Sequence, residues 1–175
     1  MRYAVFVTGA PASGKSAVAE FLANVLPAFV LLQKDVLKEA LFEVLHESAG
    51  EAVLSRQLSD AAIRLLLTLA PKCPRVILEA NFRTLETMER ERFQALDAKK
   101  LEVHCSCPFE VARRRFGFRA TERHPAHTLR DLSREIYEES EAPFGLSPLI
   151  QLDTTSPVDL PEIVNWVRRQ WPEFR

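Results

Sequence analysis

The chain has 175 residues, of which 47% are hydrophobic and 27% are charged, and its formal net charge is -1. These values fit one soluble globular domain with its own core, so a single domain is expected over residues 1–175. A nearly neutral chain has no overall attraction to nucleic acid or to an anionic membrane, so any function that needs positive charge has to be local.

The N-terminal apolar run is short and passes into a glycine-rich turn, without the long apolar region of a signal peptide. No later stretch reaches the roughly 18 apolar residues of a membrane span. With no export signal, Cys73, Cys105 and Cys107 are expected to be reduced, the last two as buried strand residues. We therefore expect a cytoplasmic monomer or homodimer, with neither membrane nor nucleic acid as a partner.

Strand patterns alternate with helical patterns along the chain. Strands are predicted at 3–8, 29–32, 75–80, 101–106 and 149–153. Helices are predicted at 15–26, 36–46, 51–70, 84–98, 129–141 and 161–171, and Pro108 is expected to open another. The helix at 84–98 is expected to face solvent. This alternation implies βαβ crossovers, so we predict a three-layer α/β/α sandwich around a five-stranded parallel sheet.

A glycine-rich loop joins the first strand to the first helix. Its residues match the pattern G-x-x-x-x-G-K-[ST] in full: Gly9, Ala10, Pro11, Ala12, Ser13, Gly14, Lys15 and Ser16. In this pattern backbone N–H groups bind phosphate oxygens, the lysine reaches the β- and γ-phosphates, and the serine hydroxyl ligates Mg²⁺. We therefore predict a site for ATP and Mg²⁺ made by this P-loop and by Ala17 behind it.

Beyond the loop, the chain resembles the small P-loop kinases of the nucleoside monophosphate kinase, shikimate and gluconate kinase, and chloramphenicol phosphotransferase type. The resemblance covers nearly the whole chain. It rests on the P-loop, on Lys34-Asp35 after the second strand, on residues 78–84, on an arginine-rich helix and on residues 152–157. It implies a P-loop NTPase fold with a small helical lid at about 116–128, and transfer of the γ-phosphoryl group of MgATP to a hydroxyl of a small molecule.

Asp35 follows the second strand, at the sheet edge where open α/β folds place their ligands. The resemblance implies that Asp35 faces the acceptor and takes its hydroxyl proton, whereas the alternative is an N-cap for the next helix. Lys38, one turn later, matches a basic residue that contacts the acceptor phosphate in nucleotide kinases, and a solvated lysine is the alternative.

Glu79 ends the apolar run of the third strand, where a charge without partners is costly. The resemblance implies that Glu79 holds the Mg²⁺ water shell, but nucleotide kinases usually have aspartate here, so Glu79 and Asp35 are rival candidates for the catalytic base. Arg83 falls where those kinases place an arginine on the acceptor phosphate. Asn81 and Phe82 depart from their usual Gly-Phe-Pro, and Asn81 is a candidate to bind a neutral hydroxylated acceptor.

Arginines are concentrated between residues 108 and 127. Arg115 and Arg119 are four residues apart and so share one helix face. The resemblance assigns Arg115 to stacking on adenine, Arg119 to the transferring phosphate and Arg123 to the lid, while the alternative is a solvated helix with salt bridges to glutamates. His124 and His127 are candidates to cap or hinge the lid, and no zinc site is predicted.

The turn after the last strand contains Thr155 and Pro157, and the resemblance implies that its backbone groups wrap the adenine. The acceptor site is expected within 36–70, where Phe42, His46, Arg56 and Gln57 face either substrate or core. The leading hypothesis is a small-molecule kinase. A nucleotide or polynucleotide kinase and an ATP-binding regulatory or toxin-like module are the alternatives.

Overall fold

The computed structural model describes residues 1–45, 51–119 and 123–174, with the backbone alone at 51–54. Its five strands form one sheet in the order β2-β3-β1-β4-β5, and every neighbouring pair is parallel. The strands are β1 (Tyr3–Thr8), β2 (Val30–Gln33), β3 (Arg75–Glu79), β4 (Lys99–Ser106) and β5 (Leu149–Asp153). The predicted five-stranded parallel sheet is therefore confirmed, with strand ends within two residues of those expected from the sequence.

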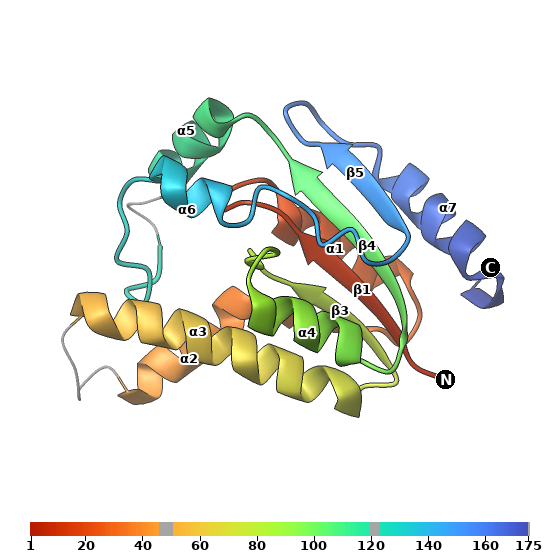
Figure 1. Cartoon of the computed structure of the whole chain (residues 1–175). Helices are drawn as coiled ribbons and strands as arrows, with labels where there is room; N and C mark the ends of the chain where they lie inside the picture. The colour runs from red at the N-terminus through yellow and green to blue at the C-terminus, as the bar shows by residue number, and fades with distance from the viewer. Residues whose placement is uncertain (46–50, 120–122, 175) are drawn as a thin grey trace.

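Helices cover both faces of this sheet, as Figure 1 shows. They are α1 (Lys15–Val25), α2 (Lys34–Leu45), α3 (Glu51–Leu69), α4 (Thr87–Ala95), α5 (Phe109–Arg119), α6 (Arg134–Glu138) and α7 (Leu160–Gln170), with short 3-10 turns at Ala70–Lys72 and Pro172–Phe174. The predicted three layers are confirmed. His46 lies outside the described residues. Among the helices that the structure describes, none is long and apolar enough to cross a membrane.

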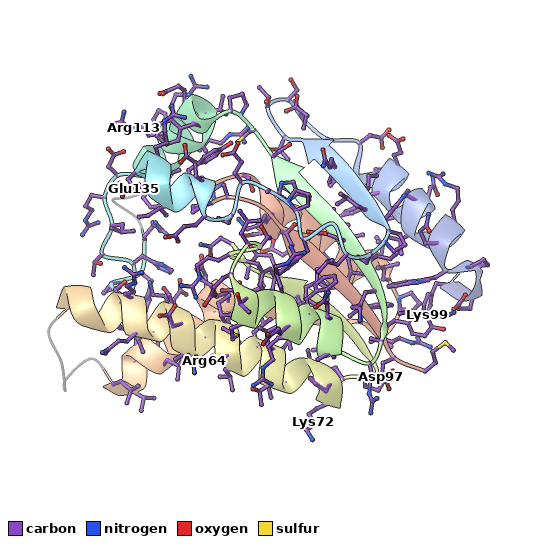
Figure 2. The ribbon with its side chains drawn as sticks, viewed as in Figure 1. Arg64, Lys72, Asp97, Lys99, Arg113 and Glu135 are labelled. Atoms are coloured by element: carbon purple, nitrogen blue, oxygen red, sulfur yellow. The ribbon has the colours of Figure 1, made fainter. Side chains whose placement is uncertain are left out.

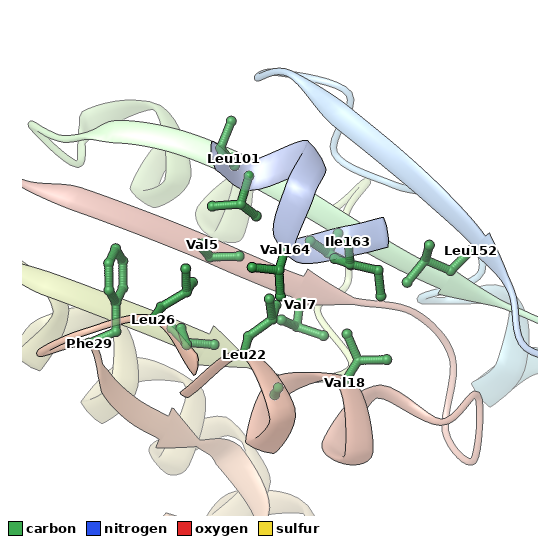
Figure 3. Packing of buried hydrophobic residues seen from close by; sticks show 14 of the residues in the cluster. Val5, Val7, Val18, Leu22, Leu26, Phe29, Leu101, Leu152, Ile163 and Val164 are labelled. Atoms are coloured by element: carbon green, nitrogen blue, oxygen red, sulfur yellow. The ribbon is translucent and has the colours of Figure 1, made fainter. Parts of the chain in front are cut away.

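The alternation of side chains along β1 builds two cores. Val5 and Val7 face α1 and α7, where they pack with Leu22 and Ile163 (Figure 3). Phe6 points to the opposite face, among residues of α3 and α4. Because both faces of a parallel sheet are covered, β1 needs apolar side chains on both sides, and this accounts for its continuous apolar run. Figure 2 labels six charged side chains that are exposed on the outside of the molecule: Arg64, Lys72, Asp97, Lys99, Arg113 and Glu135.

Two helix predictions were wrong in their details. The helix predicted at 84–98 spans only Thr87–Ala95, and it is not simply solvent-facing. The ring of Phe93 is fully buried, with its centroid 4.3 Å from that of Phe6. The helix predicted at 129–141 is reduced to Arg134–Glu138, and it begins there because the Ser133 hydroxyl accepts a hydrogen bond from the Ile136 N–H at 3.3 Å and so caps its first turn.

Gly9 directly follows β1 and lies against the backbone of Cys105 in β4, so it offers a test of this packing. Its φ is +135°, and a Cβ added there would lie 2.1 Å from the carbonyl oxygen of Cys105. Gly9→Ala is therefore expected to destabilise the fold by on the order of 2 kcal/mol or more. Gly117→Ala in α5, where an added Cβ meets nothing within 4 Å, should be neutral or slightly stabilising. Thermal unfolding of both variants checks this, and equal melting temperatures would contradict it.

Candidate functional site

A cavity of about 520 Å³ lies at the carboxyl ends of the sheet strands. Its walls come from the P-loop, the start of α2, α3, the loop after β3, the end of α5 and the segment after residue 122. In Figure 1, α5 and α6 stand at one side of this region, and α2 and α3 stand at the other. Open parallel sheets bind their ligands at this edge, because the loops that follow the strands converge there.

The P-loop has the conformation that phosphate binding requires. Ala12 and Gly14 adopt left-handed backbone angles, with φ of 61° and 86°, so that successive N–H groups can point into one concavity. The Nζ of Lys15 donates a hydrogen bond to the Ala10 carbonyl at 2.7 Å, across the loop. Burial lowers the pKa of Lys15, and the negative charge of Glu79 opposes this effect. Ser16 is exposed at the start of α1 and borders the cavity.

Thr154, which the sequence analysis did not select, fastens the turn after β5 to the P-loop. Its hydroxyl lies 2.8 Å from the Ser13 carbonyl oxygen, and its backbone N–H donates to the Ser106 carbonyl at 2.8 Å. Arg115 donates from Nη2 to the Thr154 carbonyl at 2.6 Å. The structure thus brings Arg115 to the turn that contains Thr155 and Pro157. Arg115, Thr155 and Pro157 do not border the described cavity, so their assignment to adenine stays a prediction.

Asp35 borders the cavity from the first turn of α2. The helix begins at Lys34, one residue before Asp35, so the N-cap alternative for Asp35 was wrong. Lys34 links α2 to the loop after β3. Its Nζ lies 3.2 Å from Asp35 Oδ1 and donates to Asn81 Oδ1 at 2.5 Å. Burial raises the pKa of Asp35, but the charges of Lys34, His127 and Lys15 outweigh it and hold this pKa well below its usual range. Asp35 is therefore ionised at neutral pH.

Glu79 is buried at the end of β3 and also borders the cavity. Burial raises its pKa, and the positive charge of Lys15 partly offsets this. Mg²⁺ is usually held by one or two protein oxygens together with phosphates and water. The Ser16 hydroxyl and the Glu79 carboxylate fit that donor set. No cluster of three or more histidine, cysteine or carboxylate ligands occurs in the described residues, so a fully protein-made metal cage is absent there.

Lys38 is buried rather than solvated, so the alternative reading of this residue was wrong. Only 5% of it is exposed, and its Nζ donates to the Ser55 hydroxyl at 2.9 Å. Ser55 in turn donates to the carbonyl of Ala126 at 2.8 Å, which ties α3 to the lid segment. Burial lowers the pKa of Lys38 to about 8, and the positive charges of Lys34 and Arg123 add to this effect.

The predicted lid residues divide between the cavity and the surface. Arg119 is exposed and borders the cavity, and Arg123 borders it with its guanidinium 4.6 Å from the ring centroid of Phe116. His127 Nε2 lies 2.8 Å from Glu39 Oε1, and His124 Nε2 lies 3.9 Å from Glu43 Oε1, so both histidines join the lid segment to α2. Residues 120–122, within the predicted lid, are outside the described chain.

Arg83 borders the cavity, but its guanidinium is occupied by carboxylates. Its Nε donates to Glu89 Oε1 and its Nη2 to Asp60 Oδ1, each at 3.0 Å, and Nη2 lies 3.4 Å from Glu86 Oε2. The Arg83 backbone N–H also donates to Glu89 Oε2 at 2.8 Å. The Glu89 carboxylate therefore binds both the backbone N–H and the side chain of Arg83, and so clamps the loop after β3. Arg83 does not present an unpaired positive charge to an acceptor phosphate.

The burial of Glu89 beside Arg83 predicts an unusual pH dependence of the stability of the fold. Burial raises the pKa of Glu89 from 4.5 to about 7, although hydrogen bonds from Arg83 oppose this. A carboxyl group with a raised pKa in the folded state stabilises the fold below its unfolded pKa, and this contribution is lost as the pH rises through the folded value. Between pH 5 and 8, the free energy of unfolding of the wild type should fall by on the order of 2 kcal/mol relative to Glu89→Gln.

Urea unfolding of both proteins at the two pH values measures this difference. Glu91→Gln, on the exposed side of α4, is the matched control and should follow the wild type. If the free energy of unfolding of the wild type instead rises with pH relative to that of Glu89→Gln, the ion pair with Arg83 outweighs burial.

Comparison with known proteins identifies the family. The model of the AAA_33 family, described as an AAA domain, matches residues 5–138. The chain belongs to the AAA_33 family. No curated protein matches the sequence.

Solved structures agree with this assignment. A Chloroflexus aurantiacus protein whose assignment as a kinase is provisional is 29% identical, with a TM-score of 0.83, and the match covers 96% of this chain and 97% of that one. Shikimate kinase from Acinetobacter baumannii, in complex with shikimate, is 17% identical, with a TM-score of 0.58 and coverage of 97% and 92%. The APS kinase CysC of Mycobacterium tuberculosis, in complex with AMPPNP and APS, is 20% identical, with a TM-score of 0.57 and coverage of 95% and 97%. This AAA_33 chain therefore has the P-loop kinase fold.

Several residues of the AAA_33 site were not selected from the sequence. Lys34, Ser55 and Glu89 act through partners distant in the chain, and their local sequence holds no signal for these contacts. Of the acceptor candidates proposed within 36–70, Arg56 borders the cavity, whereas Phe42 packs against the ring of His124 with centroids 5.6 Å apart. Gln57 is exposed and does not border the described cavity.

Proposed function

We propose that this AAA_33 chain is a kinase that transfers the γ-phosphoryl group of MgATP to a hydroxyl group of a small molecule. The observation that carries this proposal is that Asp35 and the P-loop lysine, Lys15, border the same cavity. The two side chains are close enough for the charge of Lys15 to lower the pKa of Asp35. A carboxylate beside a phosphate cradle is the arrangement that phosphoryl transfer to an alcohol requires.

In this proposal the P-loop N–H groups and Lys15 bind the triphosphate and neutralise charge that develops in the transition state. Ser16 and Glu79 would hold Mg²⁺, which supplies further positive charge at the phosphates. Asp35 orients the acceptor hydroxyl and accepts its proton as the acceptor oxygen bonds to the γ-phosphorus. The bond from that phosphorus to the ADP oxygen breaks in the same step. Because Asp35 is a weak base, we expect it to take the proton late, when bond formation has made the hydroxyl acidic.

Arg119 and Arg123 are proposed to approach the transferring phosphate from the lid side. Both border the cavity, and planar guanidinium groups fork onto phosphate oxygens. Asn81 is proposed to contact the acceptor through its amide nitrogen, since its oxygen already accepts a hydrogen bond from Lys34. The acceptor would then lie between α2 and the loop after β3.

A substrate screen tests the proposal. Purified protein is incubated with MgATP and with hydroxylated metabolites, nucleosides, nucleotides and antibiotics, and ADP release is read together with phosphorylated product by mass spectrometry. One phosphorylated small molecule is the expected result. Nucleotide binding without product from any small molecule would overturn the proposal and favour a regulatory role for bound ATP.

A further inference from the structure

A short turn on the lid side of the cavity holds an arginine against a histidine. The His127 N–H donates to the His124 carbonyl at 2.9 Å, and Pro125 takes the second position of the turn, which its fixed φ favours. The turn brings its two ends together, so that Arg123 Nη2 lies 3.3 Å from His127 Nδ1. The Arg123 guanidinium also lies 4.6 Å from the ring centroid of Phe116. Two rings therefore contact Arg123, one from α5 and one from its own turn.

This turn is fastened to two helices. His127 Nε2 lies 2.8 Å from Glu39 Oε1 on α2, and the Ser55 hydroxyl on α3 donates to the Ala126 carbonyl at 2.8 Å. Figure 1 shows this part of the chain reaching from α5 towards α2 and α3. Arg123 and His127 both border the cavity. The direction of the arginine therefore depends on a ring whose own place is set by α2.

The hydrogen-bond partners of His127 fix the proton on its ring. A guanidinium has N–H donors and no acceptor, so His127 Nδ1 accepts the hydrogen bond from Arg123. The single N–H of a neutral imidazole is then on Nε2, where the Glu39 carboxylate accepts it. Burial lowers the pKa of His127 and so favours this neutral ring. Each donor from Arg123 to Glu39 therefore meets an acceptor.

Arg123 lies close to the proposed base. Burial lowers the pKa of Arg123, and the negative charge of Asp35 opposes this effect. The same charge acts on His127. Since Asp35 and Lys15 border one cavity, a guanidinium near Asp35 is in the region where the phosphoryl group would be transferred.

We propose that His127 and Glu39 are positioning residues, which hold the Arg123 guanidinium in the direction of the transferring phosphate. A free arginine side chain occupies many rotamers, and fixing it costs conformational entropy. Contacts made before the substrate arrives reduce this cost, so that more of the interaction stabilises the transition state. This inference rests on the proposed kinase function, and it adds two residues that act in it through Arg123.

The test uses aluminium fluoride, which takes the place of the transferring phosphoryl group beside ADP. Binding of ADP and Mg²⁺ to the full chain is measured by calorimetry with and without aluminium fluoride. The fluoride should tighten ADP binding by the wild type about tenfold or more, because it imitates the transition state. Arg123→Ala should lose most of this gain and keep the affinity for ADP alone.

His127→Gln should also lose about tenfold of the gain, with unchanged affinity for ADP alone. Glutamine keeps an N–H donor for Glu39 but has no acceptor at the place of Nδ1, so it separates the contact with Arg123 from the attachment to α2. When Arg123→Ala is already present, His127→Gln should have no further effect, because its action passes through Arg123. A merely structural role would lower the gain in both backgrounds.

Glu39→Ala is a second variant, at a partly exposed position where the fold should tolerate it. It should lower the gain from aluminium fluoride in the same direction as His127→Gln. The matched control is Glu43→Ala, which makes the same change one turn later on α2, where Glu43 Oε1 lies 3.9 Å from His124 Nε2. This control should behave like the wild type. Equal losses in the two variants would mean that the carboxylates only attach the turn to α2, and would overturn the inference.

The other outcomes separate the two proposals. A wild type that does not bind ADP and Mg²⁺ overturns the kinase function, and this inference with it. If aluminium fluoride does not tighten ADP binding, or tightens it equally in Arg123→Ala, the placement of Arg123 and this inference are overturned, while the substrate screen still decides the kinase function. A gain that His127→Gln leaves unchanged, or lowers equally with and without Arg123, overturns this inference alone.

Discussion

Lys15→Ala is expected to abolish phosphoryl transfer, lowering its rate by about 10² to 10³-fold or more, while the protein remains folded. Lys15 would meet the β- and γ-phosphates, and it also borders the cavity. Its burial lowers its pKa, so the charged side chain is a cost to the folded state, and its removal should leave the melting temperature unchanged or higher.

The measurement is single-turnover transfer from MgATP to the acceptor found in the screen, with thermal unfolding of the same samples. Lys72→Ala serves as the control, because Lys72 is exposed and does not border the cavity. Undiminished transfer by a well-folded Lys15→Ala protein would remove the basis for the proposed kinase function.

Asp35→Asn should lower the rate of transfer by about 10² to 10⁴-fold and leave the affinity for ATP nearly unchanged. Asparagine keeps the shape of the side chain and the contact with Lys34 but cannot accept the hydroxyl proton. Glu79→Gln is the comparison variant, and it is expected to weaken Mg²⁺-dependent nucleotide binding first. If Asp35→Asn instead weakens nucleotide binding and transfer equally, Asp35 has a structural role.

The pH profile of the wild-type rate separates the two carboxylates independently of these variants. The pKa of Asp35 lies well below its usual range, so as the base it would leave the rate level as the pH falls from 8 to 5. The pKa of Glu79 is raised above 4.5, so as the base Glu79 would make the rate fall with acidification in that direction. A transfer rate that stays level between pH 8 and pH 5 is the expected result. A rate that falls on acidification in the wild type, with that pH dependence absent from Glu79→Gln, would assign the base to Glu79.

The P-loop and the sheet could be predicted from the sequence, because their signals are local. The continuous apolar run in residues 3–8, a glycine-rich turn and the following helical pattern can each be recognised within a few residues, and the family match and the strand order agree with them. Helix ends were less predictable. With Ser133 as its N-cap, α6 begins at Arg134, five residues later than the apolar pattern suggested, because a side-chain cap competes with continued helix.

The chemistry of the acceptor side was decided by the tertiary structure. Lys38 is buried and donates to Ser55 on α3, and Ser55 in turn donates to the carbonyl of Ala126; neither contact has a local sequence signal. Arg83 matched a phosphate-binding arginine by position, yet Asp60, on α3, reaches it across the fold and Glu89 clamps it.

The sequence alone therefore determined the fold class, the phosphate loop and the set of polar residues at the sheet edge. Only the tertiary structure decided which of these charges the protein itself neutralises. The physical reason is that a charge's partners and its burial depend on residues far away in the chain, such as Asp60 for Arg83 and Ser55 for Lys38. Backbone conformation and side-chain periodicity depend on near neighbours, so these could be read directly from the sequence.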